Sequence, residues 1–394
     1  MKPSHTPGSG LLRTLTMLLQ EEIPAAVKLR HELHALPELG GEEHGTIELV
    51  ADRLPVRGKS FAGTGLAARV GPAETNAVWV RAELDGLEVE ERTEVPYAAT
   101  SGLMHACGHD VHLAALVALV RAANRLQDDL PAPLVAIFQP SEERHPSGAR
   151  VLVSDPSMTK GVKAAVAAHV HPDLLWGTIG VEPGAVNASC DAAHILIKGT
   201  AGHSAYPHRA ADPVLALAHV IVGLHGIAGR RVDPIHPATL TVGCIRAGAT
   251  ENVIPEIAEA RATFRSFDET DQKILRAAVR QMVAHVSAAH GCTATTVFTK
   301  SEPPLVNDEN LAQTAQALAP HADFLVAPPW RSCGGDDFAH YGSICPSLMV
   351  FVGLQGAPNF RPAALHQPDF LPPDHAVAAV AKALALAYVA GSLG

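Results

Sequence analysis

The residues best suited to metal chemistry lie in one six-residue segment, HACGHD, which starts at His105. It contains a thiol (Cys107), a second imidazole (His109) and a carboxylate (Asp110). Gly108 permits a tight turn, so that the side chains on either side of it can point toward a common centre. A thiol, imidazoles and a carboxylate together suit zinc, and they can also hold manganese, cobalt or nickel. The segment therefore predicts part of a metal site. The alternative is a cysteine packed as a small hydrophobe beside incidental histidines.

A second segment, QPSEE, ends in the adjacent carboxylates Glu142 and Glu143. Neighbouring side chains of an extended or turning backbone point in different directions, so one carboxylate can bind a metal while the other acts as a general base on water. By themselves these residues could equally be a solvated pair. His169 and His171 follow an apolar run, and His366 stands alone in the segment LHQP.

The elements that position these residues alternate between strand and helix. Apolar spacing predicts helical structure over 11–54, interrupted near Pro37, and further helices over 111–126 and 149–153. Strands are predicted over the following segments: 77–84, 134–139 and 164–169. Strands separated by helices indicate a largely parallel sheet, whose ligands bind beyond the carboxyl ends of the strands. Asp85, the glutamate pair and His169 are all expected at that edge.

The pattern changes near residues 183–187 and again at Pro303-Pro304. The predicted strands 194–198, 239–245 and 293–299 and the predicted helices 212–229 and 270–290 lie between these points. The strand 348–353 and the helix 376–390 come after them. We therefore predict an α/β fold. A discontinuous catalytic domain (11–186 and 302–394) has a mainly parallel sheet flanked by helices, and an α+β domain (187–301) is inserted into it.

The composition and charge of the chain exclude some classes of function. The 394 residues favour two domains, and 47% hydrophobic content can build two cores. A net charge of −10 without a basic stripe argues against nucleic acid and favours a small-molecule partner. Six scattered cysteines without a C-x-x-C pair favour reduced thiols and a cytoplasmic location. We expect no signal peptide and no run that approaches the length of a membrane span.

Ordered motifs along nearly the whole chain resemble those of the metal-dependent amidohydrolases that include aminoacylases, hippurate hydrolases and auxin-conjugate hydrolases. The motifs are RHELH from Arg30, PEL from Pro37, RAELD from Arg81, MHACGHD from Met104, FQPSEE from Phe138, HVHPDLLWG from His169, GHSAYPH from Gly202, NVIP from Asn252, DDF from Asp336 and LH from Leu365.

The resemblance implies a binuclear site. Cys107, His109, Glu143, His169 and His366 match the ligands of two divalent ions, with the Cys107 thiolate as the bridge. Glu142 matches the general base. His203 matches a histidine that polarises the scissile carbonyl in a neighbouring subunit, and Asn252 matches a residue that holds the substrate. The inserted domain is thus expected to be both a lid and the surface of a homodimer. Zinc is the favoured metal. With these ligands assigned, His105 and Asp110 are expected to orient the ligands instead of binding metal.

Some positions depart from the family pattern. Glu83 stands where aspartate is commoner, His171 replaces an aromatic residue, Asp336 replaces a glutamate, and the segment from Arg144 lacks the usual glycines. His171 leaves the choice of ligand open, although the family register favours His169.

The expected activity is hydrolysis of N-acyl amino acids to a carboxylic acid and a free amino acid. A dipeptidase or an N-carbamoyl amino-acid hydrolase could use the same site. Two further alternatives are a thiol hydrolase with Cys107 as nucleophile, which leaves the glutamate pair without a role, and a binding protein that has lost catalysis.

Overall fold

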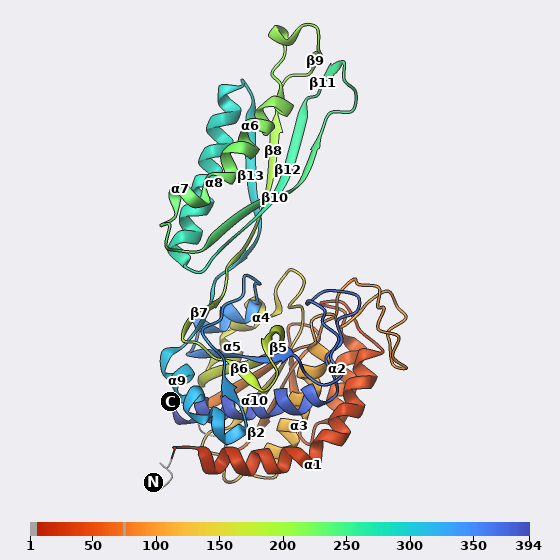
Figure 1. Cartoon of the computed structure of the whole chain (residues 1–394), viewed down its shortest axis with the longest axis vertical. Helices are drawn as coiled ribbons and strands as arrows, with labels where there is room; N and C mark the ends of the chain where they lie inside the picture. Colours follow the sequence, from red (N-terminus) through yellow and green to blue (C-terminus); the bar gives the residue numbers. More distant parts are fainter. Residues whose placement is uncertain (1–5, 74–75) are drawn as a thin grey trace. The chain divides into compact units, whose positions relative to one another are not determined.

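In the computed structural model, residues 6–73 and 76–394 are described. The chain forms two compact units, which Figure 1 colours by sequence. The first comprises the described residues up to Gly184, together with Val306–Trp330 and Asp337–Gly394. The second comprises Ala185–Leu305 and Arg331–Asp336.

The first unit contains an eight-stranded sheet in the order β1-β2-β4-β3-β5-β16-β6-β15. Its strands are β1 (Gly58–Phe61), β2 (Gly65–Val70), β3 (Ala77–Glu83), β4 (Leu134–Gln139), β5 (Val162–Leu175), β6 (Thr178–Gly180), β15 (Leu325–Val326) and β16 (Ser347–Gln355). The central strands β4, β3, β5 and β16 are parallel, as predicted from the βαβ pattern. The neighbouring strands β2 and β6 pair antiparallel with β4 and β16, and these short strands were not predicted.

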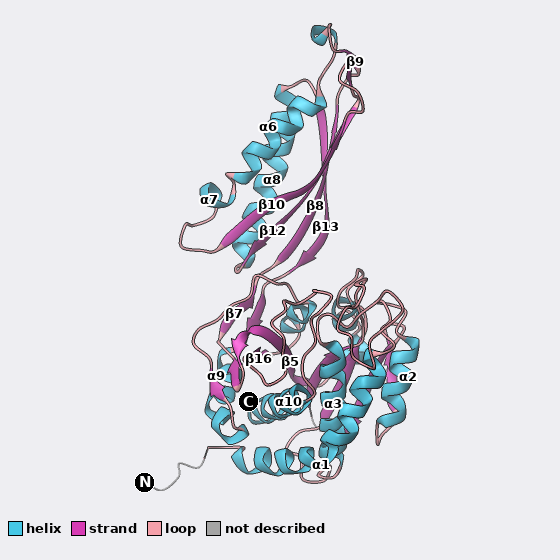
Figure 2. Cartoon of the chain, turned by 45° about the vertical axis from the view of Figure 1, so that its right-hand side comes forward, coloured by secondary structure: helices cyan, strands magenta, loops and turns pink. Residues whose placement is uncertain are grey.

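Helices cover this sheet (Figure 2). They are α1 (Ser9–His34), α2 (His44–Arg53), α3 (His109–Asn124), α4 (Gly148–Val153), α5 (Pro156–Thr159), α9 (Glu309–Leu318) and α10 (His375–Leu393), with the 3₁₀ turns η2 (Ala319–Ala322) and η3 (Asp337–Ser343). α3 and α10 are buried along almost their whole length and share one core with β3, β5 and β16.

The helix α10 corrects one expectation. Among the described residues it is the one helix long and apolar enough to cross a membrane, so the prediction that no run approaches that length is wrong. However, 83% of its most apolar window is buried inside the unit, as in the core helix of a globular domain.

The second unit is an antiparallel sheet, β10-β12-β8-β13, with α6 and α8 packed on one face. Its elements are β8 (Cys190–Lys198), β9 (Gly202–His203), η1 (Pro207–Arg209), α6 (Pro213–His225), α7 (Ala228–Arg231), β10 (Ala238–Ala247), β11 (Val253–Ile254), β12 (Ile257–Ser266), α8 (Glu269–Ala289) and β13 (Thr293–Glu302). The strands β7 (Gly184–Asn187) and β14 (Leu305–Asn307) pair where the chain passes from one unit to the other.

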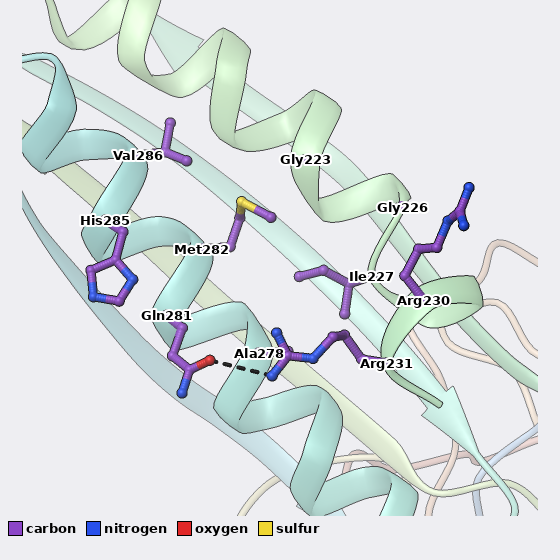
Figure 3. Close-up of a pocket in the computed structure, with 10 residues that line it drawn as sticks. All are labelled: Gly223, Gly226, Ile227, Arg230, Arg231, Ala278, Gln281, Met282, His285 and Val286. Atoms are coloured by element: carbon purple, nitrogen blue, oxygen red, sulfur yellow. Dashed lines mark hydrogen bonds between the residues drawn. The ribbon is translucent and has the colours of Figure 1, made fainter. Parts of the chain in front are cut away.

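A surface groove of about 360 Å³ lies between α6–α7 and α8 (Figure 3). Ile227 and Met282 contribute apolar surface, and Arg231 donates a hydrogen bond of 3.4 Å to Gln281 within the lining. None of the site residues predicted from the sequence lines this groove, so the groove is a separate feature of the second unit.

Candidate metal centre

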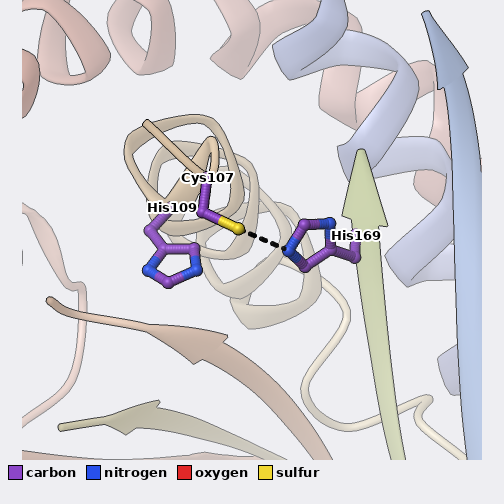
Figure 4. Close-up of side chains that lie close together, drawn as sticks. All are labelled: Cys107, His109 and His169. Atoms are coloured by element: carbon purple, nitrogen blue, oxygen red, sulfur yellow. Dashed lines mark hydrogen bonds between the residues drawn. The ribbon is translucent and has the colours of Figure 1, made fainter. Parts of the chain in front are cut away.

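The turn before α3 brings the first three predicted ligands together. Gly108 has φ +85°, and a Cβ there would lie 2.6 Å from Cγ2 of Val170, so glycine is required on both counts. The turn places Cys107 just before the helix and His109 at its first residue. His169, on β5, points its Nε2 toward the Cys107 sulfur at 3.5 Å (Figure 4).

Both of these imidazoles have Nδ1 occupied by a backbone carbonyl. His109 Nδ1 donates to the Asp85 oxygen at 2.8 Å, and His169 Nδ1 donates to the Val170 oxygen at 2.7 Å. Their Nε2 lone pairs therefore face the cluster. His109 Nε2 is buried without a hydrogen-bond partner in the described part of the chain, as expected for an atom that binds a metal. Burial lowers the pKa of both imidazoles, which keeps them neutral and able to bind a cation.

A second group of donors shares Cys107 with the first. Ligand atoms of Cys107, His109 and His169 lie within 4.8 Å of one another, and so do those of Cys107, Glu143 and His366. His366 Nε2 is 3.2 Å from Glu143 Oε1. Two donor groups that share one thiol fit a site for two cations.

His366 comes from a distant part of the chain and is held by its backbone. It adopts the left-handed φ of +66°, and its N–H donates to the Ala106 oxygen at 2.8 Å. This bond ties the loop before α10 directly to the loop before α3. The strained conformation marks a position where the surrounding structure determines the backbone.

Two buried carboxylates hold the turn that carries Glu142 and Glu143. Ser141 has φ +55°, and its N–H donates to Glu43 at 2.8 Å. The Glu143 N–H donates to Asp85 at 2.8 Å. Burial and the nearby Glu143 raise the pKa of the Asp85 carboxyl well above its usual range. The turn brings ligand atoms of Glu142 and Glu143 within 4.8 Å of His109, so Glu142 lies beside the donor cluster.

His169 and His171, the two candidate ligands at the end of the same strand, have different surroundings. The His171 ring packs against Trp330 and Phe351, with centroid distances of 4.4 and 6.1 Å. Among the described residues His171 belongs to none of the donor groups, whereas His169 faces Cys107.

Asp110 has a different role from the predicted one. The sequence predicts that it orients a metal ligand, and this is wrong. Its Oδ2 lies 2.9 Å from Arg30 Nε and 2.9 Å from His34 Nδ1. The carboxylate of Asp110 therefore joins α1 to α3. His105 is buried next to this network, and its burial lowers the pKa of the imidazole to about 3.

His203 and Asn252 lie together on the second unit. β9 and β11 pair so that His203 is opposite Val253, and the Ser204 N–H donates to the Asn252 oxygen at 3.1 Å. His203 Nδ1 accepts the Ala205 N–H at 3.1 Å, which places its proton on Nε2. Both side chains are exposed. They form a hydrogen-bond-donating group of their own, outside the donor cluster of the first unit.

Sequence reasoning missed a buried network beneath the cluster. It contains Arg81, Gln139 and Asp337, joined by Glu83 to His112 on α3. The available signal was the spacing of His112, three residues after His109, which puts both on one face of a helix.

Comparisons with known proteins place the chain among hydrolases. The model of the peptidase family M20/M25/M40 matches residues 79–388. The chain is 34% identical over 350 residues to the N-acetyl-L-cysteine deacetylase of Bacillus subtilis, covering 87% of this chain and 82% of that protein. It is 31% identical over 357 residues to the Arabidopsis thaliana IAA-amino acid hydrolase ILR1-like 4, covering 87% and 80%.

A solved structure gives the same result. The YXEP protein of Bacillus subtilis, described as a dinuclear metal binding peptidase of the M20 family, superposes with a TM-score of 0.79 at 28% identity. The match covers 94% of this chain and 98% of that one. The α/β fold class and the resemblance drawn from the motifs are confirmed.

The buried contact between α1 and α3 generates a prediction about pH. Burial lowers the pKa of His34, but Asp110 and Glu91 outweigh it and raise the pKa to about 9. Protonated His34 therefore stabilises the folded state. This stabilisation is complete below pH 6.5, which is about the pKa of histidine in the unfolded chain, and it is lost as the pH rises through 9. Replacing His34 by Asn should lower the free energy of unfolding by up to about 3 kcal/mol at pH 6.5 and by progressively less toward pH 10.

Urea unfolding monitored by tryptophan fluorescence tests this prediction, because Trp79, Trp176 and Trp330 all lie in the first unit. His285→Asn, at an exposed position of α8 in the other unit, is the control and should leave the profile unchanged. A difference between wild type and His34→Asn that stays constant from pH 6.5 to pH 10 would contradict the prediction.

Proposed function

The chain belongs to the peptidase family M20/M25/M40, and from this membership we propose that it is a metal-dependent amidohydrolase of N-acyl amino acids. The products are a carboxylic acid and a free amino acid. One observation carries the proposal: a buried thiol is shared by two groups of donor side chains, and the carboxylate of Glu142 lies beside them. Relatives named as deacetylases of acetylated amino acids and as an IAA-amino acid hydrolase support the substrate class.

Cys107, His109, Glu143, His169 and His366 are the residues that would hold two divalent cations, and Cys107 is common to the two donor groups. Thiolate and imidazole donors favour zinc, and manganese, cobalt or nickel also fit this set. When bound, the cations supply Lewis acidity to the amide carbonyl and make water nucleophilic near neutral pH.

The protein's own groups move the proton. Glu142 accepts a proton from the attacking water and delivers it to the leaving nitrogen, because its carboxylate lies within 4.8 Å of ligand atoms of His109 and Glu143. His203 donates its Nε2–H to the oxygen that gains negative charge, and Asn252 holds the substrate next to it. We assign these two residues to the active site of the neighbouring subunit in a homodimer.

Features of the second unit support dimerisation through it. β10 is an edge strand of the sheet, so one side of its backbone is available for pairing with another chain. On α6, Leu215 is 49% and Val222 77% exposed. An edge strand beside an exposed apolar helix face is suited to a two-fold symmetric interface.

Dipeptide and N-carbamoyl amino acid hydrolysis are alternatives on the same site. The geometry favours neither a thiol hydrolase nor a binding protein. Cys107 faces two metal-binding groups, and the glutamate pair has a role only in metal-assisted hydrolysis. All six cysteines are free thiols, which supports a cytoplasmic location.

The substrate class is tested by assaying hydrolysis of N-acetyl, N-benzoyl and N-carbamoyl amino acids and of dipeptides. We expect the N-acyl amino acids to give the highest kcat/KM. Prolonged dialysis against a chelator should abolish the activity, and added Zn²⁺, Mn²⁺, Co²⁺ or Ni²⁺ should restore it. Activity that survives complete metal removal would exclude the proposed mechanism.

Replacing Glu142 by Gln should lower kcat by about 10²–10⁴-fold, because the amide keeps the shape of the carboxylate but cannot accept the proton. Metal content, measured by elemental analysis, should stay at the wild-type value, because Glu142 is not a ligand. Glu143→Gln is the matched comparison and should lose metal as well as activity. Unchanged kcat in Glu142→Gln would show that the base lies elsewhere.

Mixing inactive variants tests whether His203 acts across the dimer. Glu142→Gln and His203→Ala alter different units of the chain. In a randomly mixed population half of the dimers contain one copy of each variant, and one of their two sites then has both native residues. The mixture should therefore regain about a quarter of wild-type activity. Glu142→Gln mixed with His169→Ala is the control, because both lesions affect the same centre, and it should regain none. The assignment of His203 to the neighbouring site fails if neither mixture is active.

A further inference from the structure

His112 is a buried imidazole beside the candidate metal centre that the proposed mechanism does not use. It lies on α3, and its ring centroid is 4.5 Å from that of His169 and 5.8 Å from that of His109. Its side chain is completely buried. Distance alone would make it a further ligand.

The hydrogen bonds of His112 exclude that role. Its Nε2 accepts the Val170 N–H at 3.0 Å, so the ring proton is on Nδ1, which donates to Glu83 Oε2 at 2.9 Å. Nδ1 carries the proton and the one lone pair, on Nε2, already accepts from Val170, so no nitrogen is left for a cation.

The bond to Val170 replaces a missing part of the sheet. The pairing of β3 with β5 ends at Arg81 and Ala167, whereas β5 continues to Leu175 beside β16. The Val170 amide lies beyond the end of that ladder and is buried. A buried N–H without an acceptor is costly, and the imidazole of His112 supplies the acceptor.

This contact lies next to the ligand His169. Val170 follows His169 in the chain, and its carbonyl oxygen accepts the His169 Nδ1–H at 2.7 Å. Val170 thus donates its amide N–H to His112 and orients His169 through its carbonyl oxygen. Displacing the end of β5 would move His169 Nε2 away from Cys107, which is now 3.5 Å away.

The Nδ1 side of His112 is also held, through Glu83, by a buried hydrogen-bond network. Glu83 accepts a hydrogen bond from Arg81, whose Nη2 lies 2.7 Å from Asp337 and whose Nε lies 3.1 Å from Gln139. The four charged or imidazole side chains of this path are at most 2% exposed. Water cannot replace their bonds, so the path is rigid.

We infer that His112 is a positioning residue of the metal centre, which connects the Arg81–Glu83 pair to Val170 and so holds His169 at binding distance from Cys107. The inference rests on the proposed function only in requiring that the cluster binds metal. Removing the bond to Val170 should weaken metal binding about 10–100-fold, as is typical when a group that orients a ligand is lost.

The test compares His112→Phe, which fills the space without either hydrogen bond, with His112→Gln, whose amide can still accept from Val170. Zn²⁺ affinity is measured by competition with a chromophoric chelator, and the coordination geometry by the thiolate-to-metal absorption band of the Co²⁺-loaded protein. We expect about 10–100-fold weaker Zn²⁺ binding and an altered Co²⁺ band in His112→Phe, with partial rescue in His112→Gln. Glu83→Gln, whose single amide oxygen can accept from only one of Arg81 and His112, should weaken Zn²⁺ binding less than His112→Phe does.

Tyr341→Phe is the structural control. It removes a 2.9 Å hydrogen bond to Gln139 at the far end of the same network and should leave Zn²⁺ affinity and the Co²⁺ band unchanged. If His112→Phe does not fold, the comparison of His112→Gln with Glu83→Ala, which removes the partner of His112, replaces it. Wild-type affinity and spectrum in the His112 variants, or equal losses in Tyr341→Phe, would overturn the inference. Metal titration decides this even if the wild type hydrolyses no N-acyl amino acid, because that result would refute only the proposed activity.

Discussion

The arrangement of the metal centre depends on one buried residue, Asp85, at the end of β3. Its main-chain oxygen accepts the Nδ1–H of His109, and its carboxylate accepts the N–H of Glu143. A proposed ligand on α3 and a proposed ligand in the loop after β4 are therefore oriented by the same residue. One residue can reach both segments because β3, β4 and β5 are parallel and end at the same edge of the sheet. The remaining orienting bonds, from Val170 and Ala106, are also made by backbone groups.

Orientation by the backbone lets the donor groups stay uncharged or negative. The ring nitrogens that face Cys107 carry no proton, since burial lowers the pKa of His109 and His169. The positive charges of this region lie elsewhere. Arg30 pairs with Asp110, and Arg81 pairs with Glu83 and Asp337. Each buried charge thus has its partner outside the donor cluster, which leaves the cluster able to attract cations.

The sequence predicted the parts of the structure that depend on local pattern. The strands β3, β4 and β5 are contiguous apolar runs, and the turn at Gly108 follows from the residue type, so both could be recognised without tertiary information. β12 was missed because alanines at 258, 260 and 262 occupy its buried positions, and alanine contributes little to an alternating apolar pattern. The short strands β1 and β6 offer too few residues for a periodicity.

The partners of buried polar groups could not be predicted in the same way. Asp110 was expected to orient a ligand because it follows His109, yet its partners Arg30 and His34 come from a helix some 80 residues earlier. The role of Glu43 in holding Ser141 likewise joins residues 98 positions apart. Such pairings are decided by which charges the fold leaves without water. A buried carboxylate must find a donor wherever the packing brings one, and adjacency in the chain has little influence on that choice.

The same argument explains how cations would stabilise the donor cluster. Asp85, Glu142, Glu143 and Cys107 gather acidic groups at one edge of the sheet, and the pKa of Asp85 is raised by its burial and by Glu143. Two divalent cations would relieve this repulsion and favour the ionised form of each ligand. Metal binding must therefore release protons and grow stronger as the pH rises. The arrangement of donors that makes hydrolysis chemically reasonable is thus also one that is most stable when the metals are bound.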